Sequence, residues 1–414
     1  MKMGEYLKSM VYTRKEVDDW FSGMAFPFSR YDSELGYLLR SARFKDGVDG
    51  SMSTYNYNDH GLGPRRMIRY AGTPCRINTY GNSFTQCQQV SDGETWQEVL
   101  TAHLCEPIRN FGVGGHSVYQ AYLRMKREEM KTPAEYIVFN IYDDDHYRSL
   151  VSWQGGKAGA EQYTFHICPT SPYVKVNPTT GEFVKRKNLC PTPESFYNLC
   201  NADWVYETFK DDFTLKIKWA QANVKEGTPE ESYSTIVGLA RTHGIKTCVD
   251  SVETMLKTLN TLYTKAAIFA SMRIVEKIEK FADTNGKKVL YVLSFCSDNI
   301  ARKIEDGHRF DQEFVDFLQR KGLPYVDMME AHIADYAQFK TGVKDYLKRY
   351  YIGHYNPLGN FFLAFAIKGR LVKMLRPKPI SYEWNVPNYN YIAPFGRDRS
   401  IFSISGSPWH TSTR

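Results

Sequence analysis

Residues 76–85 read RINTYGNSFT: an extended run over 76–80, followed by Gly81, Asn82 and Ser83. The run predicts a strand over 76–80, and the next helix is predicted over 94–104, so Ser83 lies where a strand gives way to a helix. A turn of this kind places the serine hydroxyl at the carboxyl edge of a sheet, beside backbone N–H groups, where an activated serine can attack a carbonyl. Ser83 is therefore the first candidate catalytic residue. The alternative is an ordinary turn serine, because Gly-x-Ser is a common triplet.

Strand and helix patterns alternate on both sides of this stretch. Strands are predicted over 107–113, 135–142, 288–295 and 323–328, and helices over 117–131, 251–283, 310–320 and 356–375. Strands separated by helices require right-handed crossovers and form a parallel sheet. The sequence thus predicts an α/β fold: a three-layer α/β/α sandwich around a flavodoxin-like parallel sheet of about five strands.

The pattern divides the chain into four predicted parts. Residues 75–150 and 251–376 form the α/β/α domain, and residues 1–74 are an N-terminal extension packing on it, with a helix capped by Thr13. Residues 151–250 are an insertion, either a lid or a decorative module, with a hairpin over 173–185. Residues 377–414 form a C-terminal tail.

Composition narrows the class of protein. The net charge of +7 is spread over 53 basic and 46 acidic residues, with no basic run interleaved with aromatics, which argues against nucleic-acid binding. Neither a signal peptide nor an apolar run long enough to span a bilayer is present, so a cytoplasmic protein is expected. The eight cysteines contain no Cys-x-x-Cys pair and are expected to be reduced. A disulfide among Cys168, Cys190 and Cys200 is the alternative. The oligomeric state stays open.

Four short blocks occur in one order along the chain, at predicted strand ends: GNSFT at 81–85, NFGVGGHS at 110–117, FNIYDDD at 139–145 and GHYNPLG at 353–359. Together they resemble the SGNH (GDSL-type) hydrolases. The resemblance covers about 75–150 and 285–375, and it implies the three-layer α/β/α fold.

The resemblance also implies roles for particular residues. Ser83 would be the nucleophile and His354 the general base, because a serine needs an imidazole to remove its proton. The N–H groups of Ser83 and Gly115 would form an oxyanion hole. No metal and no cofactor is implied.

Three polar positions depart from the family pattern. Asn82 replaces the aspartate beside the nucleophile, and Tyr351 stands where an aspartate normally orients the histidine, so Asp345 or a carboxylate of 143–145 is needed in its place. Asp144 falls where an asparagine normally completes the oxyanion hole. Burial beside Asp143 and Asp145 would raise the pKa of Asp144, so that a protonated carboxyl could donate there. A solvated acidic turn and a metal site are the alternatives for this cluster.

The expected function is hydrolysis of a carboxylic O-acyl ester of a sugar or small metabolite, by a Ser–His dyad or an incomplete triad. Because the changed residues alter the polar groups of the site, acyl transfer, lyase or isomerase chemistry in the same cleft remains an alternative. A binding module that keeps the fold without catalysis is another.

Overall fold

The structure, a computed structural model, describes residues 1–58, 62–153 and 168–382. Its centre is a five-stranded parallel sheet in the order β11-β10-β7-β5-β6. The strands are β5 (Ile77–Tyr80), β6 (Arg109–Asn110), β7 (Tyr136–Tyr142), β10 (Lys288–Ser294) and β11 (Tyr325–Asp327). Numbered within the sheet this is the order 2-1-3-4-5, which confirms the predicted fold class. The direction in which successive strands are added to the sheet reverses between β5 and β7, and ligands bind at such a switch point in open α/β sheets.

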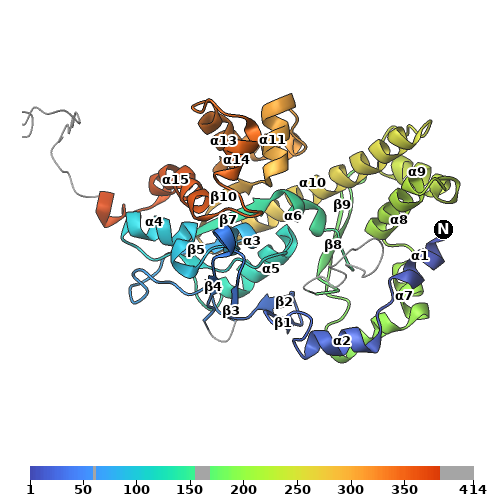
Figure 1. The fold of residues 1–414 in the computed structure, drawn as a ribbon, viewed down its shortest axis with the longest axis horizontal. Helices are drawn as coiled ribbons and strands as arrows, with labels where there is room; N and C mark the ends of the chain where they lie inside the picture. The colour runs from blue at the N-terminus through green and yellow to red at the C-terminus, as the bar shows by residue number, and fades with distance from the viewer. Residues whose placement is uncertain (59–61, 154–167, 383–414) are drawn as a thin grey trace, which may run out of the picture.

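Helices cover both faces of the sheet (Figure 1). On one face α4 (Trp96–Leu104) packs against α15 (Pro357–Met374), which also contacts α13 (Met328–Tyr336). On the other face α10 (Val252–Thr284) packs against α5 (Val118–Glu129) and α12 (Gln312–Arg320). Three further helices follow directly after strands: α3 (Ser83–Gln86) after β5, α6 (Asp143–Arg148) after β7 and α11 (Ser297–Asp306) after β10. Helix α14 (Val343–Lys348) contacts α11.

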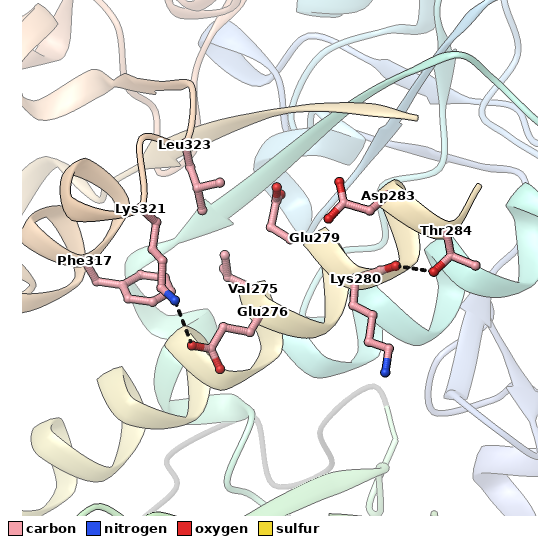
Figure 2. A pocket seen from close by; sticks show the side chains of 9 residues that line it. All are labelled: Val275, Glu276, Glu279, Lys280, Asp283, Thr284, Phe317, Lys321 and Leu323. Carbon is pink, nitrogen blue, oxygen red and sulfur yellow. Dashed lines mark hydrogen bonds and ion pairs between the residues drawn. The ribbon is translucent and has the colours of Figure 1, made fainter. Parts of the chain in front are cut away.

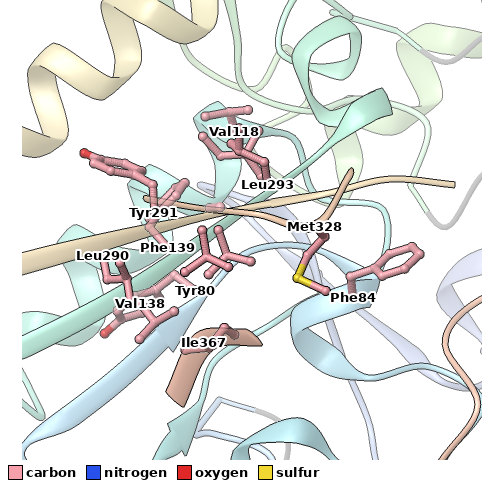
Figure 3. Close-up of a cluster of buried hydrophobic side chains, with 14 of the residues drawn as sticks. Tyr80, Phe84, Val118, Val138, Phe139, Leu290, Tyr291, Leu293, Met328 and Ile367 are labelled. Carbon is pink, nitrogen blue, oxygen red and sulfur yellow. The ribbon is translucent and has the colours of Figure 1, made fainter. Parts of the chain in front are cut away.

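The core follows from the apolar runs of the central strands (Figure 3). Strand β7 reads YIVFNIY and is buried over its first six residues, as expected for a strand covered by helices on both faces. Phe139 of β7 and Tyr291 of β10 lie in the same cluster, together with Ile367 of α15. The two helical layers and the sheet therefore share one hydrophobic core.

A second hydrophobic cluster joins the N-terminal segment to the middle of the chain. Trp20 stacks on Phe196, with ring centroids 5.2 Å apart. Helix α1 contacts α7 and α8, and Figure 1 shows these elements together at one end of the molecule. The N-terminal segment therefore packs on residues 151–262 as well as on the sheet. Its elements are α1 (Met3–Ser9), α2 (Arg14–Phe21), β1 (Ser29–Asp32), β2 (Gly36–Leu39), β3 (Ala42–Phe44) and β4 (Ser53–Tyr55); those of the middle segment are β8 (Tyr173–Asn177), β9 (Glu182–Arg186), α7 (Ala202–Phe209), α8 (Phe213–Lys225) and α9 (Glu230–Thr242).

Several local predictions can be compared with the structure. Thr13 caps α2, and β8 and β9 form the expected hairpin. The strand predicted over 107–113 is shorter, because the chain passes directly over α3: a β-carbon at Gly112 would lie 2.1 Å from the Gln86 nitrogen. All eight cysteines are free. Within the described ranges, no helix combines the length and the apolar character needed to cross a membrane. Most of the predicted tail, residues 383–414, lies outside the described residues.

Candidate active site

Ser83 is the first residue of α3, directly after the tight turn that ends β5. Gly81 has φ +150°, and a β-carbon there would lie 2.7 Å from the Asn140 carbonyl oxygen, so only glycine fits. Asn82 caps the helix by accepting a hydrogen bond from the Phe84 N–H at 2.9 Å. The turn therefore presents the Ser83 side chain at the carboxyl edge of the sheet, where it is 6% exposed.

His354 reaches Ser83 from the loop before α15. The distance between His354 Nε2 and Ser83 Oγ is 2.8 Å, within hydrogen-bond reach of a nucleophile and its base. The His354 backbone N–H donates to Gln89 Oε1 at 2.6 Å, and Gly353 before it adopts φ +110°. The structure thus brings together two residues that are 271 positions apart in the chain.

The His354 imidazole is neutral near pH 7. Burial lowers its pKa to about 4, and the nearby positive charge of Arg148 acts in the same direction, whereas the Asp46 carboxylate opposes the shift. A neutral imidazole can accept the Ser83 proton through Nε2 when Nδ1 carries the hydrogen. None of the described carboxylates forms a hydrogen bond with this imidazole.

The residues expected to orient His354 lie elsewhere. The Tyr351 hydroxyl donates to the Phe295 carbonyl at 3.1 Å and lies 3.3 Å from His332 Nε2. Asp345 is exposed and pairs with Lys348 at 3.0 Å. Neither side chain hydrogen-bonds His354.

The glycine loop 112–115 passes beside Ser83. A β-carbon at Gly114 would lie 3.6 Å from Ser83 Cβ, and the Gly114 N–H donates to Gln86 Oε1 at 2.9 Å. Gly115 follows with φ +81°, a conformation that favours glycine. In the part of the chain that the structure describes, the backbone N–H groups of Ser83 and Gly115 have no hydrogen-bond acceptor. Both donors are thus free to receive a ligand oxygen.

The three consecutive aspartates begin α6 and point in different directions. The Asp143 carboxylate accepts from the Cys296 N–H at 2.9 Å and from Asn299 Nδ2 at 2.7 Å, which ties β7 to the start of α11. The expected burial of Asp144 is wrong: its side chain is 61% exposed and pairs with Arg148 at 3.1 Å. Successive residues of a helix lie about 100° apart, so Asp144 faces outward when its two neighbours face inward. Asp144 is therefore not placed to donate to an oxyanion beside Ser83. Among the described residues, no group of three acidic, histidine or cysteine side chains could hold a metal ion.

Asp145 stabilises the turn that carries Asn82 and Ser83. It accepts from Asn82 Nδ2 at 2.9 Å, from the Tyr142 N–H at 3.1 Å and from Arg148 Nη1 at 3.0 Å. Burial raises the pKa of Asp145 to about 7, and the Arg148 charge limits this rise. The Asn82 amide therefore both caps α3 and donates to a buried carboxylate.

Substitution of Asn82 tests the hydrogen bond from its amide to the Asp145 carboxylate. Asn82→Asp removes a donor and puts a second carboxylate next to Asp145, so we expect it to lower the free energy of unfolding at pH 8 by about 1–3 kcal/mol. In this variant the two neighbouring carboxyl groups bind a proton more tightly in the folded protein than in the unfolded chain, so their folded-state pKa is raised. Because protonation removes the repulsion, the loss in the free energy of unfolding should shrink as the pH falls from 8 to 5. Urea unfolding at the two pH values measures the difference.

The double variant Asn82→Asp/Asp145→Asn is the control, since it restores one amide and one carboxylate with the polarity reversed. We expect it to recover part of the lost stability. A double variant less stable than Asn82→Asp would contradict the assigned hydrogen bond.

The N-terminal segment contributes contacts that the sequence did not reveal. The Tyr37 hydroxyl donates to the Gly114 carbonyl at 2.6 Å, which holds the glycine loop. The Tyr55 hydroxyl accepts from the Gln89 N–H at 2.6 Å and donates to Asp46 Oδ2 at 2.9 Å. Through Gln89 this chain of bonds reaches the His354 backbone. No motif marks these residues, because each acts through position and not through a recognisable spacing.

The chain was compared with known proteins. No family model and no curated protein matches it. Three solved structures are similar in part. LAE5, an α/β hydrolase from the metagenome of Lake Arreo, Spain, has a TM-score of 0.36 and 11% identity, over 72% of this chain and 94% of that one. A protein of the G-D-S-L lipolytic family from Desulfitobacterium hafniense has a TM-score of 0.31 and 9% identity, over 71% and 98%. An acylhydrolase candidate from Bacteroides fragilis has a TM-score of 0.32 and 12% identity, over 75% and 93%. At these scores, function has to be argued from the site itself.

Proposed function

We propose that this protein is a serine hydrolase that cleaves a carboxylic O-acyl ester of a sugar or small metabolite through a Ser83–His354 dyad. The observation that carries the proposal is the 2.8 Å contact between Ser83 Oγ and His354 Nε2 at the carboxyl edge of the sheet. The free N–H groups of Ser83 and Gly115 beside it support the proposal.

The reaction uses these groups in two steps. Ser83 Oγ attacks the ester carbonyl carbon while His354 Nε2 takes its proton, and the N–H groups of Ser83 and Gly115 stabilise the oxyanion. The imidazolium then gives its proton to the departing alkoxide, which leaves an acyl-enzyme. A water molecule, deprotonated by His354, attacks this acyl group and releases the carboxylic acid and free Ser83.

A fluorophosphonate probe tests the proposal directly, because it labels only activated serines. We expect one label, located at Ser83 by mass spectrometry, with release of 4-nitrophenol from 4-nitrophenyl acetate by the unlabelled protein. If an activated serine transfers its acyl group to an alcohol faster than to water, labelling persists and the product is a new ester. Absence of labelling would instead favour lyase or isomerase chemistry or a binding module.

The pH dependence follows from the buried imidazole. Because protonated His354 cannot accept the Ser83 proton, kcat/KM for a neutral ester should fall on the acid side, and it should reach half its plateau near pH 4. The ordinary value for histidine would place this midpoint near 6.5. Initial rates from pH 3.5 to 8 measure the profile.

Asp46→Asn is the matched variant, since its amide still accepts from Tyr55. Removing the negative charge that opposes the shift should move the midpoint to lower pH. A midpoint above 6 in the wild type would contradict the lowered pKa of His354. An upward shift in the variant would contradict the effect assigned to the Asp46 charge.

A further inference from the structure

A second polar pocket, of about 700 Å³, lies beside the candidate active site, between α6, α8, α10 and α11. Ser83 does not line this pocket. Arg148, which does, also pairs with Asp145, and Asp145 accepts from Asn82 next to Ser83. The residues that line the pocket include the cationic side chains Arg148, Lys218, Arg302 and the imidazole of His308, two tyrosines, Tyr147 and Tyr263, and one acidic residue, Asp144.

The charges in this pocket do not balance within the protein. Arg148 is paired with Asp144 at 3.1 Å and with Asp145 at 3.0 Å. Lys218 and Arg302, by contrast, form no hydrogen bond or ion pair with any described residue. The pocket therefore has two cations in excess of the acidic groups that face it.

Lys218 is the more informative of the two cations because it is partly buried in the middle of α8. Burial lowers the pKa of its amine, and Asp212 is the acidic group that opposes the shift. Asp212 is already occupied: its carboxylate accepts from Ser152 Oγ at 2.6 Å and, as the cap of α8, from the Leu215 N–H at 3.0 Å. A partly buried ammonium without a partner is costly, and an anion in the pocket would remove that cost.

The remaining lining groups suit an organic ligand. The rings of Tyr147 and Tyr263 meet edge to face, with centroids 5.0 Å apart, and the Tyr147 hydroxyl bonds Thr264 at 2.9 Å. Aromatic faces and hydroxyls pack on ring-bearing, polar molecules, whereas the cations bind a charged group.

A different pocket, shown in Figure 2, has no excess of cations. It is lined mainly by α10 and the end of α12, and it contains both Glu276 and Lys321, which pair at 3.6 Å. Glu279 there accepts from the Tyr291 hydroxyl at 2.6 Å. Leu323, which also lines it, precedes β11, so the pocket lies at the amino edge of the sheet, opposite Ser83. Its lining carries three acidic side chains, Glu276, Glu279 and Asp283, against two lysines, so it offers an anion no excess of cations.

We propose that the pocket between α6, α8, α10 and α11 binds the oxyanion group, carboxylate or phosphate, of an organic ligand, with Lys218 and Arg302 as its cationic anchors. The anion would also face Arg148, whose partner Asp145 accepts from Asn82 next to the nucleophile. The ligand is either the substrate itself, carrying its own anionic group, or a separate anion that binds next to the site. Binding does not depend on Ser83 being a nucleophile.

Isothermal titration with three probes tests the binding: inorganic phosphate, glucuronate and, as the uncharged counterpart, glucose. All titrations are made at one ionic strength, held with sodium chloride. We expect phosphate and glucuronate to bind, and we expect glucose to bind at least tenfold more weakly than glucuronate. Lys218→Met and Arg302→Gln should each weaken glucuronate binding at least tenfold.

Lys225→Met is the control for Lys218→Met, because it removes the same charge from an exposed position on the same helix. Its affinity for glucuronate should equal that of the wild type. Arg302 is exposed, so Arg302→Gln keeps the test valid if Lys218→Met unfolds. The proposal is overturned if the wild type binds neither anion, or if the Lys218, Arg302 and Lys225 variants lose affinity equally.

Kinetics distinguish the two sources of the anion. If the anion belongs to the substrate, the ratio of kcat/KM for O-acetyl glucuronate to that for O-acetyl glucose should fall at least tenfold in Arg302→Gln and stay constant in Lys225→Met. If a separate anion binds, the ratio stays constant, and phosphate changes the rate with O-acetyl glucose in the wild type but not in Arg302→Gln. A wild type without esterase activity would refute the proposed hydrolase and leave the titration results unaffected.

Discussion

Ser83→Ala and His354→Ala are each expected to lower kcat/KM for ester hydrolysis by about 10⁴- to 10⁶-fold, because the nucleophile and its base act as one unit. The reason is the single hydrogen bond between Ser83 Oγ and His354 Nε2, through which the proton must move before the carbonyl can be attacked. The double variant should be no slower than either single variant, since losing one member already removes the function of the other. Release of 4-nitrophenol from 4-nitrophenyl acetate measures all three rates.

Exposed residues of the same types provide controls for these variants. Ser22→Ala and His103→Ala make the same chemical changes at exposed positions and should retain full activity. If Ser83→Ala kept more than about a tenth of the wild-type rate, Ser83 would not be the nucleophile, because the loss of a true nucleophile is far larger.

The second large effect is expected from Arg65, a buried residue of the N-terminal segment. Its guanidinium pairs with Asp92 at 2.7 Å and donates to the carbonyls of Thr54, Gln86, Cys87 and Val90. Gln86 ends helix α3, and Cys87 and Val90 belong to the loop that follows it. Arg65→Met leaves the buried Asp92 carboxylate without its cation, and breaking such a pair costs about 3–5 kcal/mol in the free energy of unfolding.

Urea unfolding followed by tryptophan fluorescence measures this loss. Arg65→Lys should recover little of it, because an ammonium cannot reproduce the planar donors that reach four carbonyls and a carboxylate. The exposed neighbour Arg66 provides the control, and Arg66→Met should change the free energy of unfolding by less than about 0.5 kcal/mol. A loss below 1 kcal/mol in Arg65→Met would show that this segment does not support the loop.

Much of the sheet could be predicted because buried parallel strands leave a plain signal. Residues 136–142 and 288–294 are apolar except for Asn140, Lys288 and Ser294, and each stretch lies in the sheet where the alternation of strands and helices placed it. The strand predicted over 107–113 is shorter in the structure, for a local reason. Gly112 has to pass close to Gln86, so the chain leaves the sheet after Asn110, and nothing in the apolar pattern records that approach.

The candidate site could be predicted in part. Ser83 and His354 each follow the rule that functional side chains gather at the carboxyl edge of a parallel sheet, and the structure places them in contact. The position of Asp144 could not be predicted, because a shift of one residue at the start of a helix turns a side chain from the interior to the solvent. The partners of His354 were missed for a different reason: Gln89 and Asp46 belong to loops whose positions are set by packing.

The sequence by itself determined the parallel sheet and the serine between a strand and a helix, because both depend on patterns within a few neighbouring residues. Only the tertiary structure decided which of three adjacent aspartates faces the nucleophile turn, that Arg65 holds the loop after α3, and that Lys218 and Arg302 meet beside Arg148. The physical reason is separation along the chain: Arg148, Lys218 and Arg302 lie on three helices, and only the packing of the folded chain brings their charges to one pocket.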